Sequence, residues 1–354
     1  MADLARVASR VWYGDDAAAA ATRALLAPAA LLYGAAMRAR GALYRTGVLG
    51  AHDLALPAVS VGNVTVGGTG KTPMSSWLAQ RLHDRGARPA IVLRGYGDDE
   101  PLVHRLLTPD ARVVVDADRV RGVAEAARLS ADVAVLDDAF QHRRARRDED
   151  VVLVSAERVL GPARLLPAGP YREPLSALRR ASLIVVTRKS ASREEGAAAL
   201  RRVREVAPNV PAAIVALGLD ALRRVSGAES ASLHELAGAR VLAVSAIGEP
   251  AAFFAQLAAL GARLTTVTFP DHHAFSRGDV EALVRRASGV DRVVCTLKDA
   301  VKLGPLWPDP ALAPWYVSQR VTVEAGGDAL DQLIARLLDA RAHSTEQTGI
   351  GRPS

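Results

Sequence analysis

Cysteine, aromatic residues and long apolar runs are all scarce in this sequence of 354 residues. The single cysteine, Cys295, excludes a disulfide framework and a zinc site built from cysteines alone, and it favours a reducing, cytoplasmic compartment. Aromatic residues make up only 4% of the chain, so we expect a core built from Val, Leu, Ile and Ala. At this length the chain can form about two domains, each with a core of its own.

No uncharged run near the N-terminus reaches the roughly 18–20 residues that a membrane-spanning helix needs. The stretch ALLAPAALLYGAAM (24–37) has 14 residues, and no A-x-A-type cleavage site is followed by the start of a mature-looking domain, which argues against a secretory signal. Arginines flank this stretch and Trp and Tyr are interspersed, a combination typical of a helix that lies on a membrane surface. We therefore predict that residues 1–45 form a membrane-associated helical segment; a helix packed on the domain core is the alternative.

Basic residues outnumber acidic residues, 45 to 38, and give the chain a net charge of +7. Such a balance favours a polyanionic partner, which can be nucleic acid, an anionic membrane or a phosphorylated substrate. A solvated, arginine-rich surface without such a partner is the alternative.

From Pro57 onward, apolar strands alternate with amphipathic helices. VVLVS (151–155) and LIVVT (183–187) contain no internal polar residue. Continuous apolar strands separated by helices indicate a parallel sheet that is covered on both faces. A second pattern of the same kind begins with ARVLAVSAI (239–247). The sequence therefore predicts the α/β class, with two domains.

The segment VSVGNVTVGGTGKTP (59–73) runs from an expected strand through a Gly-rich loop into an expected helix, which is the context of a phosphate-binding loop. The glycines would let backbone N–H groups turn toward phosphate oxygens at the positive end of the helix. Lys71 would bridge the β- and γ-phosphates, and the Thr72 hydroxyl would bind Mg²⁺. The first glycine of the Walker A pattern is missing, and Thr65 stands in its place.

The second half of such a site is a buried strand that ends in Asp and holds the hydration shell of Mg²⁺. DVAVLDD (132–138) ends in Asp137 and Asp138, for which capping of the next helix is the alternative role. Guanine-specific proteins carry N-K-x-D after a late strand, whereas this chain has RKSA (188–191), without Asp at the last position. ATP is therefore the expected nucleotide.

Seven motifs follow one another in the order found in one enzyme family. They are GNVTVGGTGKTP (62–73), RGYG (94–97), DEP (99–101), LDDAFQHRRARRD (136–148), LLPAGPYREPLSALRRA (165–181), FPDHHAF (269–275) and TLKDAVKL (296–303). In these motifs the sequence resembles the tetraacyldisaccharide 4'-kinases, the lipid A kinases, whose phosphate loop also has threonine at the position of Thr65. The resemblance implies ATP-dependent transfer of the γ-phosphate to the 4'-hydroxyl of a tetraacyldisaccharide 1-phosphate, giving lipid IVA, at the cytoplasmic face of the bacterial inner membrane.

The resemblance also implies a fold in which a P-loop NTPase-type parallel-sheet domain is joined by a two-stranded linker to a second, smaller α/β domain. Our expected elements divide accordingly into a helical segment (1–45), a P-loop kinase domain (46–210) with a returning C-terminal helix (325–341), linker strands (211–220 and 315–324), a smaller domain (221–314) and a disordered tail (342–354). The expected ligands are ATP, Mg²⁺, the acylated disaccharide lipid and the inner-membrane surface. We expect no nucleic-acid partner and infer no obligate protein partner.

By the same resemblance, Asp99 in DEP is expected to accept the proton of the substrate hydroxyl, with His272 as its partner. From the residues alone Asp99 would be an exposed turn carboxylate and His272 a structural histidine; we prefer His272 to His273. Lys71 and Asp138 complete the expected catalytic set. The expected ATP-binding residues are Asn63, Thr65, Gly67, Gly68, Thr69, Gly70, Lys71 and Thr72; the expected Mg²⁺ ligands are Thr72, Asp137 and Asp138; and the expected substrate contacts are Arg119, Gln141, His142 and Glu173. Lys298 and Asp299 are weaker candidates, equally explained by a salt bridge between helices.

The sequence departs from the family pattern in a few places. Only Asp98 separates RGYG from DEP, where the family usually has a longer stretch. Ala139, Ala246 and Leu297 stand where the family has Gly, Gly and Glu. These changes concern the loop geometry near DEP and any role of TLKD, and they leave the phosphate loop intact. The alternative function, from a different class, is a membrane-associated P-loop NTPase that acts as a switch or chaperone without a small-molecule acceptor.

Overall fold

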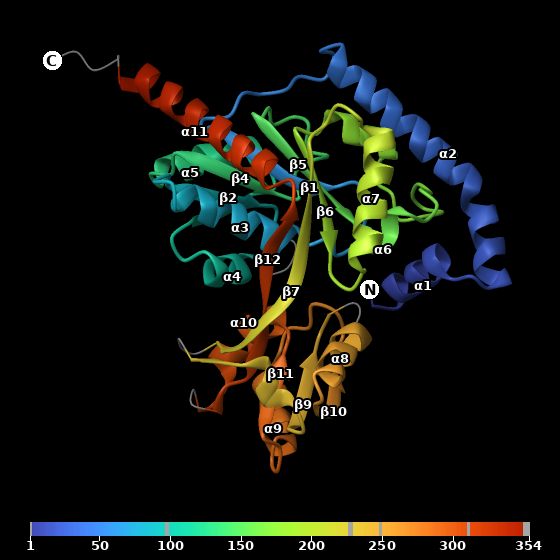
Figure 1. Ribbon diagram of the computed structural model, residues 1–354, viewed down its shortest axis with the longest axis vertical. Coiled ribbons are helices and arrows are strands. Elements are labelled where there is room, and N and C mark those ends of the chain that lie inside the picture. Colours follow the sequence, from blue (N-terminus) through green and yellow to red (C-terminus); the bar gives the residue numbers. More distant parts are fainter. Residues whose placement is uncertain (1, 96–98, 226–228, 248–249, 310–311, 350–354) are drawn as a thin grey trace. The chain divides into compact units, whose positions relative to one another are not determined.

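The structure is a computed structural model that describes residues 2–95, 99–225, 229–247, 250–309 and 312–349 (Figure 1). The contacts within the chain divide it into two compact units. The larger unit comprises Ser9–Tyr96, His104–Leu217 and Val321–Ser354, and the smaller unit comprises Met1–Ala8, Gly97–Val103 and Gly218–Arg320. Strands β7 (Ala212–Arg224) and β12 (Trp315–Ala325), which cover the predicted linker, each belong in part to both units.

The larger unit is built on a parallel sheet. Its strands are β1 (Ala58–Asn63), β2 (Pro89–Leu93), β3 (Arg112–Val115), β4 (Val133–Asp137), β5 (Glu149–Ser155) and β6 (Leu183–Arg188), in the spatial order β6-β5-β1-β4-β2-β3. All of these pairings are parallel. Because β1 and β4 are neighbours and Val61 pairs with Asp137, the strand before the Gly-rich loop and the strand that ends in Asp137 finish at the same edge.

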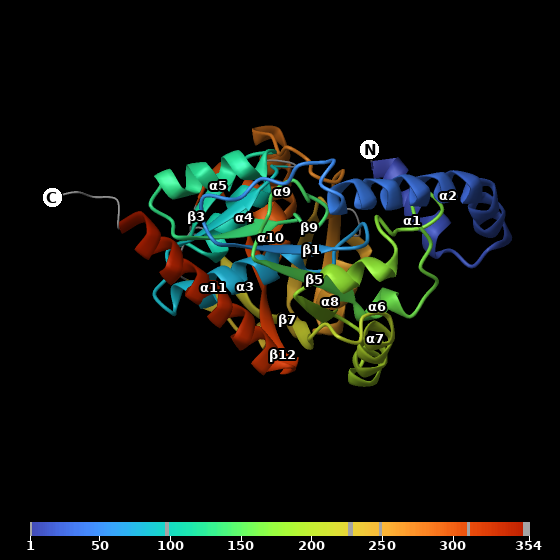
Figure 2. The same cartoon turned by 90° about the horizontal axis from the view of Figure 1, so that it is seen from above.

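Helices cover both faces of this sheet, because successive side chains along a strand point to opposite sides. Val151 and Leu153 of β5 pack in one core with α3 (Lys71–His83) and α11 (Gly327–Gly349). Val152 and Val154 pack in another with α6 (Ala156–Val159) and α7 (Arg193–Val206), and α5 (Arg119–Arg128) covers β2 and β4. Figure 2 shows α3 and α11 on one side of the sheet and α5 on the other. The predicted doubly covered α/β sheet is confirmed.

The smaller unit repeats this layered pattern. Its strands β9 (Arg240–Ser245), β10 (Arg263–Thr268) and β11 (Arg292–Cys295) pair in parallel in the order β10-β9-β11, and β12 follows β11. Side chains of β9 alternate between a core with α9 (Arg277–Arg286) and α10 (Leu297–Leu303) and a core with α8 (Pro250–Ala259). A short strand, β8 (Ser230–Ala231), pairs antiparallel with β7.

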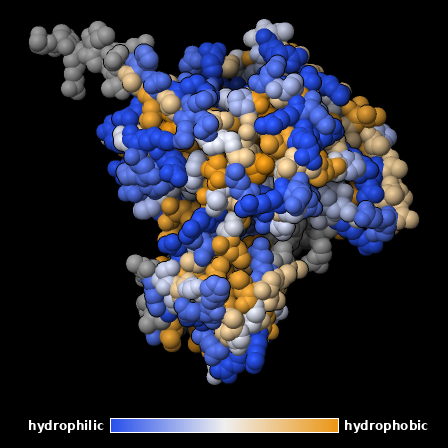
Figure 3. Space-filling model, in the orientation of Figure 1, coloured by the Kyte–Doolittle hydropathy of each residue, from blue (hydrophilic) through white to orange (hydrophobic). Residues whose placement is uncertain are grey.

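The N-terminal segment forms two helices, α1 (Ala2–Tyr13) and α2 (Ala17–Arg45). One side of α2 is fixed to the larger unit: Tyr33 Oη donates to the Arg172 carbonyl (2.9 Å), and Arg40 Nη2 donates to the Gln141 carbonyl (3.0 Å). Its other side exposes 73–81% of the surface of Leu25, Leu31 and Leu32, and apolar residues appear along this edge in Figure 3. Among the described residues, α2 is the one helix long and apolar enough to cross a membrane, although the uncharged run within it is shorter than a span.

Two segments differ from their predicted structure. Asp99 does not lie in an exposed turn, as the residues alone suggested, but begins α4 (Asp99–Leu107) and is 3% exposed. Helix α11 continues to Gly349, and its apolar stripe packs on α3. Residues 342–349 of the expected disordered tail are therefore helical, and 350–354 lie outside the described residues. The shortened turn at Asp98 also lies outside them.

Candidate active site

The Gly-rich loop between β1 and α3 has the backbone of a phosphate-binding loop. Gly67 and Gly70 have φ of 108° and 90°, in the left-handed region that glycine enters without strain. A Cβ on Gly70 would lie 2.2 Å from Leu217 Cδ1, so a side chain there would require the buried Leu217 to shift. Gly70 is the N-cap of α3, which begins with Lys71 and Thr72, so the amides of the first helical turn are directed at the loop.

Side chains at or just after the ends of β1 and β6 hold this loop. Asn63 Nδ2, at the end of β1, donates to Thr69 Oγ1 (2.9 Å), while Asn63 Oδ1 is buried without a partner among the described residues. Thr187 Oγ1 of β6 donates to the Thr69 carbonyl (2.9 Å). Lys189 Nζ, just after β6, donates to the Gly68 carbonyl (2.7 Å). The loop is therefore anchored at both Gly68 and Thr69.

Glu157 in turn fixes the segment that carries Lys189. Its Oε1 accepts the backbone N–H groups of residues 189–191 at 2.6, 3.1 and 3.3 Å, and its Oε2 accepts from Ser155 Oγ (2.6 Å). Burial acts to raise the pKa of Glu157, but these hydrogen bonds outweigh it and hold the pKa at about 2. The carboxylate is ionised at neutral pH and organises the backbone next to the phosphate loop.

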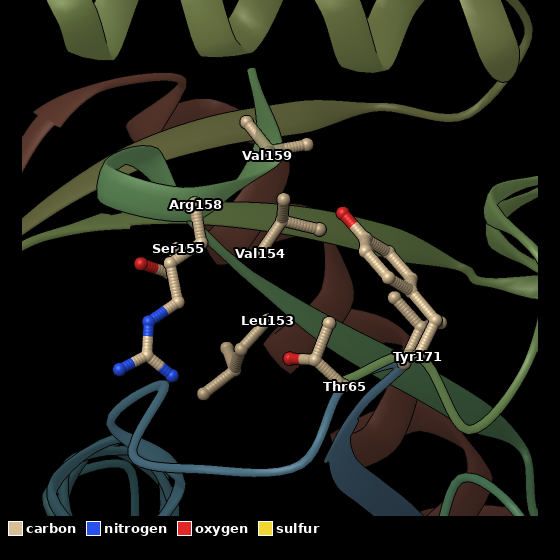
Figure 4. A pocket seen from close by; sticks show the side chains of 8 residues that line it. Thr65, Leu153, Val154, Ser155, Arg158, Val159 and Tyr171 are labelled. Atoms are coloured by element: carbon tan, nitrogen blue, oxygen red, sulfur yellow. The ribbon is translucent and has the colours of Figure 1, made fainter. Parts of the chain in front are cut away.

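Thr65 occupies the position of the first Walker A glycine without needing the conformational freedom of glycine. Among the described non-glycine residues, positive φ occurs at Ser130, Asp138 and His272. The backbone of Thr65 forms an isolated bridge with Tyr171, and both side chains line a small cavity (Figure 4). Threonine is therefore compatible with the local backbone.

Asp137, at the end of β4, is engaged by protein groups on both of its oxygens. Oδ1 accepts from Ser75 Oγ (2.9 Å) and from the Asp138 backbone N–H (3.1 Å), and Oδ2 lies 3.1 Å from His104 Nε2. His104 Nδ1 lies 3.0 Å from Ser76 Oγ. A hydrogen on Nε2 allows donation to Asp137 and leaves Nδ1 to pair with the Ser76 hydroxyl. Burial acts to raise the pKa of Asp137, but His104, a nearby lysine and Ser75 hold it below its usual value.

Asp138 is more accessible and belongs to a cluster of charged groups. Its side chain is 32% exposed, and Arg172 Nη1 lies 3.0 and 3.2 Å from its two oxygens. Lys71 Nζ lies 3.7 Å from Asp138 Oδ1. The structure therefore brings together Lys71 and Asp138, two of the predicted catalytic residues, and adds Arg172.

Asp99 and His272, the other two predicted catalytic residues, are in contact within the smaller unit. His272 Nδ1 lies 3.2 Å from Asp99 Oδ1; the carboxylate is buried, whereas 45% of the imidazole is exposed. His272 has a φ of 56°, which is strained for a residue with a side chain. A buried carboxylate oriented by a histidine is suited to accept a proton from a bound hydroxyl.

His273 has contacts of a different kind. Its Nε2 lies 3.2 Å from Asp279 Oδ2, and its ring stacks on Phe269 with the ring centres 4.8 Å apart. Asp279 also accepts the backbone N–H of Ser276 in the capping box of α9. His273 therefore supports the fold of the smaller unit, and the preference for His272 stays a prediction.

Three of the predicted substrate contacts lie just after β4 or in the PYREPL segment. Gln141 Nε2 donates to the Asn63 carbonyl (2.9 Å) and to Glu173 Oε1 (3.2 Å). Glu173 is buried and pairs with Arg180 (2.9 Å). His142 is partly buried, and burial lowers the pKa of its imidazole. Gln141 and Glu173 therefore form one network with the end of β1.

Arg119, the fourth predicted substrate contact, is buried behind Asp137. Its Nη1 donates to the Asp116 carbonyl (2.7 Å) and its Nη2 to the Asp137 carbonyl (3.0 Å). Burial lowers the pKa of this guanidinium. In the structure the side chain supports the backbone of β4, and its contact with the substrate stays a prediction.

The oxygen donors beside the loop suit a hard cation such as Mg²⁺. Thr72 supplies a hydroxyl and Asp138 an accessible carboxylate, whereas both oxygens of Asp137 already have protein partners and Oδ2 keeps room for a water. The described residues include no group of three or more His, Cys, Asp or Glu that could hold a metal by themselves. Such a donor set fits Mg²⁺ that is bound largely through nucleotide phosphates and water.

Sequence comparison connects this geometry with a known enzyme. The model of the family Tetraacyldisaccharide-1-P 4'-kinase matches residues 22–339. The chain belongs to this family. A tetraacyldisaccharide 4'-kinase of Anaeromyxobacter dehalogenans is 41% identical over 86% of both chains, and one of Geobacter metallireducens is 37% identical over 80% of this chain and 89% of its own. The crystal structure of LpxK from Aquifex aeolicus in complex with ATP matches 89% of this chain and 99% of its own, with a TM-score of 0.71 and 29% identity.

Membership of the 4'-kinase family confirms the resemblance found in the sequence motifs and the predicted P-loop type of fold. The chain is a phosphotransferase of lipid A biosynthesis that acts on a hydroxyl group. The family decides against the alternative of a switch or chaperone without a small-molecule acceptor.

Some residues of this kinase site were not predicted from the sequence. Ser75 follows Lys71 by four positions on α3, and this spacing places both on one side of the helix, so a signal was present. His104, Arg172 and Lys189 carried no comparable signal. Their contacts depend on segments that are distant in the sequence from the residues they touch.

Proposed function

We propose that this chain transfers the γ-phosphate of ATP to the 4'-hydroxyl of a tetraacyldisaccharide 1-phosphate and so forms lipid IVA. The observation that carries the proposal is the buried Asp99 carboxylate beside the His272 imidazole, 3.2 Å apart. The names of the relatives from Anaeromyxobacter and Geobacter, and the ATP in the related Aquifex structure, support the same activity.

In the proposed reaction Asp99 accepts the proton of the 4'-hydroxyl. The hydroxyl oxygen forms a bond to the γ-phosphorus while the bond between that phosphorus and the β,γ-bridging oxygen breaks, so that ADP leaves. A hydrogen on His272 Nδ1 would be donated to Asp99 Oδ1 and would orient the carboxylate, so that Oδ2 takes the proton of the substrate. The reaction therefore needs Asp99 ionised and His272 correctly placed.

The phosphate loop would hold the triphosphate. Backbone N–H groups around Gly67–Gly70 would bind phosphate oxygens, and Lys71 would move its charge from Asp138 to the β- and γ-phosphates. Thr72 and Asp138 would hold Mg²⁺, with Asp137 supporting its hydration shell. When bound, Mg²⁺ neutralises charge on the transferred phosphoryl group.

Helix α2 would keep the enzyme at its lipid substrate. Its exposed leucines form an apolar surface, and arginines of the same helix suit anionic headgroups, which together favour attachment to the cytoplasmic face of the inner membrane. Changing Leu31 and Leu32 to Glu should move the protein from the membrane fraction to the soluble fraction. Unchanged membrane recovery would contradict this part of the proposal.

The kinase proposal is tested with purified protein, Mg²⁺, γ-labelled ATP and the tetraacyldisaccharide 1-phosphate in detergent micelles. The unchanged protein should transfer label to the lipid. Asp99→Asn keeps the size of the side chain but accepts no proton, and it should lower kcat by about 10²–10⁴-fold with little change in ATP affinity. Asp110→Asn, at an exposed carboxylate beyond α4, is the matched control and should keep normal turnover.

Two results would contradict the proposal in different ways. If no label reaches the lipid with the unchanged protein, the chain lacks the proposed activity. If the unchanged protein is active and Asp99→Asn is equally fast, the activity stands but Asp99 is not the base.

A further inference from the structure

We propose that Asp299, in the TLKDAVK segment (296–302), is a positioning residue that holds His272 against Asp99. This inference rests on the proposed role of the Asp99–His272 pair. In the sequence, Asp299 was equally explained by a salt bridge between helices. Its contacts in the smaller unit connect it to the backbone around His272.

Asp299 is a fully buried carboxylate with specific hydrogen bonds. Its Oδ2 accepts from the Ala246 backbone N–H (3.1 Å) and from Thr296 Oγ1 (2.7 Å), and Thr296 is also the N-cap of α10. Its Oδ1 has no hydrogen-bond partner among the described residues, and the Lys302 ammonium lies 4.0 Å away. Burying a carboxylate is unfavourable unless its contacts are retained, so the bond to Ala246 is a strong constraint on that backbone.

The constrained backbone leads directly to His272. Ala246 follows the last residue of β9, and its carbonyl accepts the backbone N–H of His272 (3.1 Å). Asp299 and His272 therefore bind the two adjacent peptide groups of one residue. His272 has the left-handed φ of 56°, and a conformation of this kind persists only where neighbouring contacts impose it.

Helix α10, which carries Asp299, also contacts the residues next to His272 and Asp99. Lys302 Nζ donates to the carbonyl of His273 (3.1 Å), and Lys298 Nζ lies 3.7 Å from Glu100 Oε1, next to Asp99. α10 thus fixes the segment on either side of the His272–Asp99 contact. Without Asp299 the Ala246 N–H would be unpaired and this segment could shift. A displacement of about 1 Å at a catalytic group is sufficient to slow a reaction by roughly 100-fold.

The test measures kcat and KM for ATP and for the lipid in the kinase assay. Asp299→Ala should lower kcat by about 100-fold with little change in either KM, because positioning of the base is lost while ligand binding remains. Asp299→Asn keeps an oxygen for Ala246 and Thr296 and should restore most of the turnover. In the His272→Ala background, Asp299→Ala should cause no further loss, since both act through one group.

Asp291→Ala is the matched control. Asp291 accepts the backbone N–H of Arg240 (2.8 Å) at the first residue of β9, so it makes the same type of contact at the opposite end of that strand. This variant should keep the turnover of the unchanged protein. If Asp299→Ala does not fold, Thr296→Val replaces it, and we expect a fall of kcat of about tenfold that disappears in the His272→Ala background.

The outcomes separate this inference from the proposed function. Full activity of His272→Ala would contradict the role of the pair itself. A slow His272→Ala with normal turnover of Asp299→Ala, or with losses that multiply in the double variant, would leave the pair in place and overturn the positioning role. Normal turnover of Thr296→Val would overturn it when Asp299→Ala does not fold.

Discussion

His104 should be essential for the orientation of the Asp137 carboxylate and for the stability of the fold around it, and its replacement tests both. The imidazole is fully buried between Ser76 Oγ (3.0 Å) and Asp137 Oδ2 (3.1 Å). Loss of the hydrogen bond to the carboxylate should destabilise the fold by about 2 kcal/mol, and loss of the bond to Ser76 by about 1 kcal/mol. The cavity left by His104→Ala adds roughly 1–2 kcal/mol, so we expect a total of about 4–5 kcal/mol.

Two further variants separate the two contacts. His104→Gln places an amide N–H near the position of Nε2 and keeps the bond to Asp137, whereas His104→Asn reaches only the position of Nδ1 and keeps the bond to Ser76. The free energy of unfolding should therefore decrease in the order His, Gln, Asn, Ala, with a gap of about 1 kcal/mol between Gln and Asn. Urea unfolding in detergent measures this order.

Nucleotide binding gives an independent measurement. The affinity for Mn²⁺-ATP, followed by the electron paramagnetic resonance of free Mn²⁺, should fall about 10–100-fold in His104→Ala and less in His104→Gln, because Asp137 loses its orientation. His83→Ala is the control, because His83 is an exposed histidine whose Nε2 also lies near a carboxylate, 3.9 Å from Asp110 Oδ2. Surface changes of this kind alter the free energy of unfolding by no more than about 0.5 kcal/mol. A loss of less than 1 kcal/mol in His104→Ala, or Asn equal to Gln, would refute the reasoning.

Two other predictions concern the phosphate loop and its support. Gly70→Ala should weaken ATP binding at least tenfold, because the left-handed φ costs about 1–2 kcal/mol and the new Cβ meets Leu217. Gly86→Ala is the control: Gly86 has a similar φ but no neighbour within 4 Å of an added Cβ, so this change should affect stability alone. Normal ATP affinity of Gly70→Ala, measured by calorimetry, would contradict the prediction. Glu157→Gln should lower the free energy of unfolding at neutral pH. The pKa of Glu157 in the folded protein is about 2, below its usual value of 4.5, so its stabilising effect is complete above pH 4.5 and is lost as the pH falls toward 2. In urea unfolding at about pH 6, 4.5 and 3, the free energies of unfolding of the two proteins should therefore converge as the pH falls. A difference that stays constant would count against this role.

The sequence by itself determined the larger features of this protein. Local patterns carry them: uninterrupted apolar strands require a sheet buried on both faces, and a Gly-rich loop between strand and helix requires backbone geometry that few other residues permit. The motif order and the phosphate loop were therefore sufficient to predict the class of fold and the family. Thr65 did not obscure this prediction, because the positive φ values lie at Gly67 and Gly70.

Only the tertiary structure decided which polar side chains meet. Asp99 read as an exposed turn carboxylate because three acidic residues follow one another, yet it begins a helix and is buried against His272, 173 positions away. Arg119 was expected to contact the substrate, and the fold adds that its buried side chain donates to the Asp137 carbonyl. Such pairings depend on which strands are neighbours and how far each helix extends, and these are properties of long-range packing that no local pattern encodes. For the same physical reason Asp299 was equally explained by a salt bridge in the sequence, whereas the fold links it to His272 through the backbone of Ala246.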